Sequence, residues 1–244
     1  MKPVFGALGY AAANLLHPRM LWLMIWPMLI AAGFWGIAAL FLWVRTAMRI
    51  AEIIQSGLDF FHLQAPDAAM IAAHAVLFLL FVPLVWLTAL FILSVFGMQA
   101  MVEHIASRRF PELARRKGGG IAGSLVNSLA ALAGLVLLGA VSIPFWLIPP
   151  LWPVIPVAIM GWVNQKVLRY DALAEHASAD EMRTIFAARR GSLYALGAIL
   201  ALLAYVPLVG FLAPVLFGLA FIHFLLDELE ALRKAPIEGE AVRL

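Results

Sequence analysis

The sequence predicts an all-α integral membrane protein, and two observations carry this prediction. Hydrophobic residues make up 64% of the 244-residue chain and charged residues only 13%, against about 45–50% and about 25% in a typical soluble domain. The apolar residues also gather into long runs without Asp, Glu, Lys or Arg. The chain has no cysteine, which excludes disulfides, thiolate metal sites and cysteine nucleophiles.

The first two runs predict two long transmembrane helices. Residues 20–44 form an uncharged run of 25 residues, which at about 1.5 Å per residue crosses the roughly 30 Å hydrocarbon core. Residues 68–102 form a second run of 35 residues, with Pro83 inside. Between them, polar side chains recur at helical spacing, which predicts a helical extension outside the bilayer over 45–67. These are Arg45, Arg49, Glu52, Ser56 and Asp59.

Proline interrupts the two later runs, so each predicts a helical hairpin. The first covers 121–165 and contains Pro144, Pro149, Pro150, Pro153 and Pro156. The second covers 191–226 and is interrupted by Pro207, Gly210 and Pro214. Its arms of about 16 and 12 residues fall short of the roughly 20 residues that span a bilayer. We therefore expect the second hairpin to be re-entrant.

Shorter patterns predict local structure. A helix at the membrane interface is predicted before the first span, with an apolar stripe of Phe5, Leu8, Ala12 and Leu15. Ser178 and Glu181 have capping-box spacing, which predicts the start of a helix. The Lys117–Gly120 segment is predicted to be a helix-entry linker, that is, a short connection that leads into the next helix. Small residues recur at four-residue spacing from the end of this segment and predict close helix packing; the alternative is the wall of a hydrated path. They are Gly120, Ser124 and Ser128.

The charges predict the topology of a single membrane domain, 1–244. Both termini are expected in the cytoplasm, together with a basic loop at 103–120, a segment at 166–190 and a tail at 227–244. This arrangement places fifteen of the seventeen Lys and Arg residues on the cytoplasmic side, as the positive-inside rule requires.

Four arginines are candidate binding residues for an oxyanion, because guanidinium groups offer paired donors to tetrahedral anions. They are Arg19, Arg183, Arg189 and Arg190. The alternative is that they only anchor helix ends. His74 and His223 lie in apolar runs and are candidates for a proton relay; the alternative is hydrogen bonding near the interface.

The sequence gives no sign of an enzyme. None of the six histidines has another at i+4, so no metal site is predicted, and no cofactor is expected. Gly-x-Ser-x-Gly and His-Glu-x-x-His are absent, so no catalytic residue is assigned. The net charge of +3 lies in membrane-flanking segments, which favours the lipid bilayer over nucleic acid as the partner.

The order of motifs resembles the CysZ-like sulfate permease family within the etoposide-induced-protein domain group. The residues that carry the resemblance begin with Gly9-Tyr10, Pro18 and Pro27 and continue with Tyr170-Asp171, Glu175-His176, Glu181-Met182-Arg183-Thr184, Arg189-Arg190, Gly197, Val206-Pro207-Leu208, Pro214 and Gly218. The family usually has glycine, an aliphatic residue and arginine after the first proline. Here Arg19 takes the glycine position, and Leu21 and Trp22 take the expected arginine positions.

The resemblance implies a multi-pass protein of the bacterial inner membrane that assembles as a homo-oligomer and takes up sulfate or a related inorganic oxyanion. Two functions from different classes remain open at this point. One is an anion permease or channel. The other is a non-transporting scaffold or lipid-perturbing protein of the same family.

Overall fold

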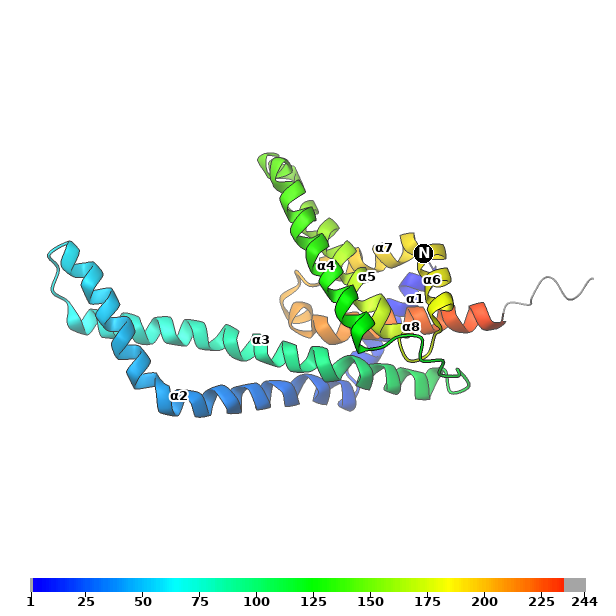
Figure 1. The fold of residues 1–244 in the computed structure, drawn as a ribbon, viewed down its shortest axis with the longest axis horizontal. Helices are drawn as coiled ribbons and strands as arrows, with labels where there is room; N and C mark the ends of the chain where they lie inside the picture. Colours follow the sequence, from blue (N-terminus) through cyan, green and yellow to red (C-terminus); the bar gives the residue numbers. More distant parts are fainter. Residues whose placement is uncertain (1, 235–244) are drawn as a thin grey trace, which may run out of the picture. The chain divides into compact units, whose positions relative to one another are not determined.

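The computed structural model describes residues 2–234, and every regular element in that range is helical (Figure 1). The helices are α1 (Lys2–Leu15), α2 (Pro18–Phe60), α3 (Pro66–Arg109), α4 (Ile121–Ser142), the 3-10 turns η1 (Ile143–Leu147) and η2 (Pro149–Leu151), α5 (Val154–Leu173), α6 (Ala179–Ala188), α7 (Arg190–Leu203) and α8 (Pro207–Lys234). The predicted all-α class is confirmed. The end of the predicted tail, which contains Arg243, lies outside the described residues.

Within residues 2–234, four helices are long and apolar enough to cross a membrane. The candidate spans are Pro18–Phe60, Pro66–Leu93, Ala122–Leu147 and Val209–Lys234. A further pair, α6 and α7, is bent by 76° and passes the same test when taken together. The predicted class of membrane protein is therefore confirmed by helix length and composition.

The chain divides into two compact units. The smaller unit runs from Trp22 to Val95, and the larger unit combines the chain up to Leu21 with the chain from Phe96 onward. Each unit is described separately below.

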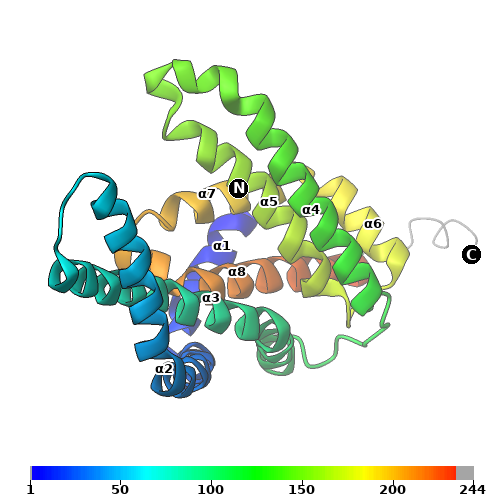
Figure 2. The same cartoon turned by 60° about the vertical axis from the view of Figure 1, so that its left-hand side comes forward.

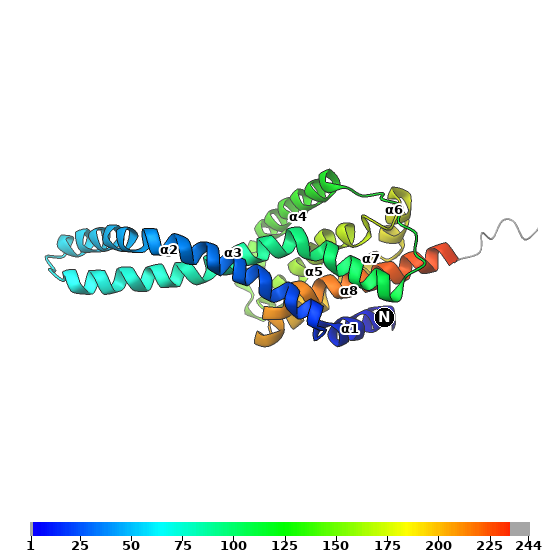
Figure 3. The same cartoon turned by 90° about the horizontal axis from the view of Figure 1, so that it is seen from below.

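In the smaller unit, α2 and α3 lie side by side (Figures 1 and 3). The Trp35 indole N–H donates to the Thr88 hydroxyl at 2.9 Å, and the Trp43 ring lies 6.3 Å from the Phe81 ring. Helix α2 continues without interruption to Phe60, so the polar stripe after the first apolar run is helical, as its spacing indicates.

In the larger unit, α8 contributes more buried apolar residues than any other helix, and α1 packs against it (Figure 2). The residues of α1 that are buried are Val4, Ala7, Ala11 and Leu15. Phe5, which belongs to the predicted stripe, is 60% exposed. The predicted helix is present, and its packing face uses mainly small residues, because close approach between two helices selects alanine; whether the predicted stripe lies in the membrane interface stays a prediction.

The first hairpin consists of α4 and α5 joined by the two 3-10 turns, so the prolines interrupt the helix where the sequence predicts. The two helices pack tightly, and Ser124 of the predicted small-residue stripe takes part, whereas a Cβ on Gly120 would meet no atom within 4 Å. Ser124 donates to the Asp171 carboxylate at 2.7 Å, and a Cβ on Gly134 would lie 2.2 Å from the Trp162 ring.

The second hairpin differs from the prediction in the length of its second arm. Gly210 and Pro214 lie inside the 28-residue helix α8 and do not break it. A helix tolerates one internal proline because only one backbone hydrogen bond is lost, and neighbouring helices compensate for that loss. The chain instead reverses at residues 204–206, between α7 and α8.

Candidate functional site

The loop between α3 and α4 is held against the loop between α5 and α6. The Lys117 N–H donates to the Glu175 carbonyl at 3.0 Å, and the Gly118 N–H donates to the Ala177 carbonyl at 2.9 Å. A Cβ on Gly118 would lie 2.4 Å from the Ala177 carbonyl oxygen, so glycine is needed for this approach. The predicted helix-entry linker therefore also fixes the chain that precedes α6.

Glu181 starts α6 through the predicted capping box, which the structure confirms. The Glu181 N–H donates to the Ser178 hydroxyl at 3.2 Å, and the Ser178 N–H donates back to the Glu181 carboxylate at 2.7 Å. The Arg233 guanidinium also donates to both carboxylate oxygens, at 2.9 and 3.0 Å. Hydrogen bonding to Arg233 lowers the pKa of Glu181 to about 2.

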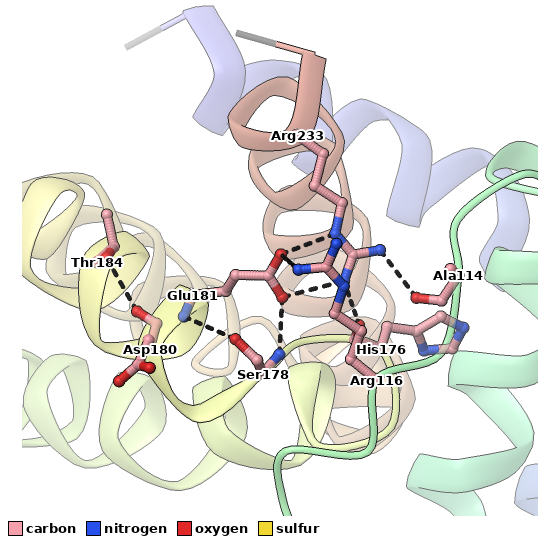
Figure 4. A network of polar contacts seen from close by, with 8 residues as sticks. All are labelled: Ala114, Arg116, His176, Ser178, Asp180, Glu181, Thr184 and Arg233. Carbon is pink, nitrogen blue, oxygen red and sulfur yellow. Dashed lines mark hydrogen bonds and ion pairs between the residues drawn. The ribbon is translucent and has the colours of Figure 1, made fainter. Parts of the chain in front are cut away.

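Figure 4 shows that the Arg233 side chain contacts three separate parts of the chain near this carboxylate. The same guanidinium donates to the main-chain carbonyls of His176 at 2.7 Å and Ala114 at 2.8 Å. Arg116 adds a further ion pair to Glu181 at 2.9 Å. These contacts tie α6, α8 and both loops together, so Glu181, Arg116 and Arg233 form a structural clamp in which the carboxylate is fully partnered.

Two of the four predicted arginines are paired with carboxylates. Arg189 donates to Glu228, which is largely buried, at 2.8 Å. Arg183 contacts Asp180 at 3.5 Å on an exposed turn. These partners favour the helix-anchoring interpretation for Arg183 and Arg189.

Arg19 lies in a second polar group, at the junction of α1 and α2. Its backbone N–H donates to the His17 ring at 3.2 Å, and the His17 ring lies 4.8 Å from that of His104 on α3. His104 is 5% exposed, and neither of its ring nitrogens has a hydrogen-bond partner. Burial lowers the pKa of His104, and the charges of His17, Arg108 and Arg19 lower it further. We call His17, Arg19, His104 and Arg108 the α2-entry group.

The fourth predicted arginine, Arg190, belongs to a third group that sequence reasoning missed. Arg169 on α5 lies 4.7 Å above the Phe186 ring. Its pKa is lowered by burial and by the charge of Arg190, and the pKa of Lys166 is lowered by burial and by Arg169. The spacing of three residues between Lys166 and Arg169 was a signal in the sequence. The proximity of these two residues to Arg190 left no signal in the sequence, because it depends on how α5 packs on α7.

The two histidines proposed for proton transfer have different surroundings. His74 contacts the main-chain carbonyl of Met70 at 2.9 Å within its own helix, and its ring lies 6.3 Å from that of Trp43. His223 stacks on Tyr10 at 4.1 Å and has a buried Nδ1 atom without a hydrogen-bond partner. The contact with Met70 favours hydrogen bonding as the role of His74, and the stacking on Tyr10 favours packing as the role of His223.

No group of three or more His, Asp or Glu residues suited to a metal ion occurs within residues 2–234. The described chain is helical, and several of its helices are apolar and long enough to span a membrane. These features define a multi-pass membrane protein. A comparison with protein families is more specific. The family model described as "Sulfate transporter CysZ/Etoposide-induced protein 2.4" matches residues 7–214.

This chain therefore belongs to the sulfate transporter CysZ/etoposide-induced protein 2.4 family. No curated protein and no solved structure matches the chain.

Proposed function

We propose that this protein is a permease for sulfate or a related tetrahedral oxyanion in a bacterial inner membrane. Family membership supports the class of activity, and the apolar helices support the location in a membrane. The observation that carries the proposal is the α2-entry group, in which buried, unpartnered nitrogen atoms adjoin arginine charges.

The α2-entry group has the donors that an oxyanion needs. A neutral imidazole always carries one N–H donor, so a sulfate oxygen beside His104 would give this buried ring the partner that it lacks. Arg19 adds a planar set of donors that remains charged at any physiological pH. Within the described residues, Arg19 forms no ion pair, in contrast to Arg183 and Arg189.

Anion binding at this group should depend on pH. Since burial and neighbouring positive charges lower the pKa of His104, its ring is neutral at pH 7 in the absence of an anion. A bound anion favours the protonated ring. By linkage, sulfate should therefore bind more tightly as the pH falls through the pKa that His104 has in the complex.

Uptake of radiolabelled sulfate into proteoliposomes tests the proposal. Losing one charge-assisted contact costs about 1.5–3 kcal/mol, so Arg19→Ala should reduce uptake about tenfold or more. Arg49→Ala is the matched control, because Arg49 is exposed and its ion pair with Glu52 lies within one turn of α2. His104→Phe should weaken uptake and remove its increase at low pH.

Two results would contradict the proposal. One is a wild-type protein that gives no sulfate-dependent uptake, and the other is equal uptake by the Arg19 and Arg49 variants. In either case the non-transporting scaffold or lipid-perturbing protein would be the better account of this chain.

A further inference from the structure

The third polar group, composed of Lys166, Arg169 and Arg190, has positive charge without a matching negative charge. In the described part of the chain, none of its members forms an ion pair, whereas Arg116, Arg189 and Arg233 are each paired with a glutamate. The side-chain hydrogen bond of Arg169 goes to the neutral Gln165, at 3.4 Å. The Nε atom of Arg169 is buried and has no partner.

Close packing between α5 and α7 holds these charges together. A Cβ on Gly197 would lie 2.4 Å from the Gly161 carbonyl oxygen, and the Asn164 amide donates to the Gly197 carbonyl at 3.2 Å. The backbone segments that carry Lys166, Arg169 and Arg190 are therefore fixed relative to one another. Like charges held together in a partly buried place cost free energy, which a bound anion would offset.

The group lies where both helices change from polar to apolar. No charged residue occurs between Gly118 and Gln165, and Lys166 and Arg169 follow directly. On the other helix, Arg190 is the last charged residue before an uncharged run that extends to Leu226. Cations at such a boundary lie at the depth of the lipid phosphates.

We propose that Lys166, Arg169 and Arg190 bind the phosphate headgroup of an anionic phospholipid. The source of the phosphate is inferred from position: at the end of two apolar helices, lipid phosphate is the most concentrated anion. The same helices, with α8, border an apolar pocket of about 210 Å³ whose lining includes Met160, Ala201 and Phe217. Such a pocket offers space for part of an acyl chain.

Thermal unfolding of the purified protein in neutral detergent micelles tests this site without any transport. The micelles contain phosphatidylglycerol in one arm and phosphatidylcholine in the other. Phosphatidylglycerol should raise the midpoint of the wild type more than phosphatidylcholine does, and Arg190→Gln should lose more than half of that difference. Inorganic phosphate and sulfate at millimolar concentration, the third arm, should not reproduce it.

Arg183→Gln is the matched control. It removes the same charge from an exposed arginine on the adjacent helix, whose partner is Asp180, and it should keep the full response to phosphatidylglycerol. Lys166→Gln is the second test variant and decides the question if Arg190→Gln does not fold in phosphatidylcholine. The proposal is overturned if the test variant responds like Arg183→Gln, or if free phosphate or sulfate gives the same shift as the lipid.

Discussion

The pKa of the Glu181 carboxylate is lowered strongly, because the Arg233 guanidinium holds it in the charged form. A folded-state pKa of about 2 lies below the ordinary value of 4.5. Glu181 therefore contributes stability that is fully present above about pH 4.5 and is lost as the pH falls toward 2.

Glu181→Gln should accordingly destabilise the protein at pH 7 by about 1.5–3 kcal/mol, the usual range for hydrogen bonds to a charged group. The difference from the wild type should shrink as the pH falls from 4.5 toward 2. Thermal unfolding in detergent micelles across this range measures it. Glu230→Gln removes only the i,i+4 pair with the exposed Lys234 and should cost less than about 0.5 kcal/mol. A difference that stays constant down to pH 2.5 would contradict the assigned pKa.

The contacts of Glu181 and Arg189 show which interactions of single residues can be predicted from the sequence and which cannot. Ser178 and Glu181 stand three residues apart, and a local pattern of that kind predicts the cap correctly. Arg233 lies 52 residues from Glu181, and no local pattern connects them. The partner of Arg189, Glu228, is likewise 39 residues distant. The sequence therefore identified basic residues of interest but could not separate the paired from the unpaired.

At the scale of elements, the packing of helix α1 on α8 can be tested at two neighbouring alanines. Ala11 is fully buried where α1 packs on α8, and Ala12 is exposed. Ala11→Leu should force the two helices apart and cost about 1–3 kcal/mol, whereas Ala12→Leu should change stability little. Thermal unfolding of the two variants compares them directly. Equal effects would mean that α1 does not pack on α8 through this face.

The turn between α7 and α8 decides whether the second hairpin is re-entrant. Helix α7 has 14 residues, about 21 Å at 1.5 Å per residue, which is less than the hydrocarbon thickness of about 30 Å. We therefore expect the turn at 204–206 to end within the membrane, although α8 alone is long enough to cross.

A cysteine at the exposed Ala204 tests this turn, since the chain contains no other cysteine. Gly210 is less suitable, because a Cβ there would lie 2.4 Å from the Ala204 carbonyl oxygen. Ala204→Cys should resist an impermeant thiol reagent added from either side of sealed membranes, and it should react after solubilisation. Rapid labelling from the outside would identify the hairpin as two complete spans.

For the whole molecule, hydropathy and charge were sufficient to predict the helical membrane class, because both are properties of long stretches. They were not sufficient for the length of α8. Pro214 breaks helices in water, but here it is accommodated within a continuous helix. Nor did they predict the division into two compact units, which depends on contacts between distant segments.

The orientation in the membrane is the property of the whole chain that its charges predict. Arg45 and Arg49 belong to the smaller unit, between the apolar parts of α2 and α3, and the other fifteen basic residues lie outside that stretch. Basic residues are retained in the cytoplasm, so Ser56 should face the outside and Ser107 the cytoplasm. Both side chains are exposed and therefore accessible to labelling.

In intact cells, an impermeant thiol reagent should label Ser56→Cys and leave Ser107→Cys unlabelled until the membrane is opened. Labelling at position 107 from outside would reverse the topology and would place the α2-entry group, which contains His104 and Arg108, on the side from which sulfate arrives.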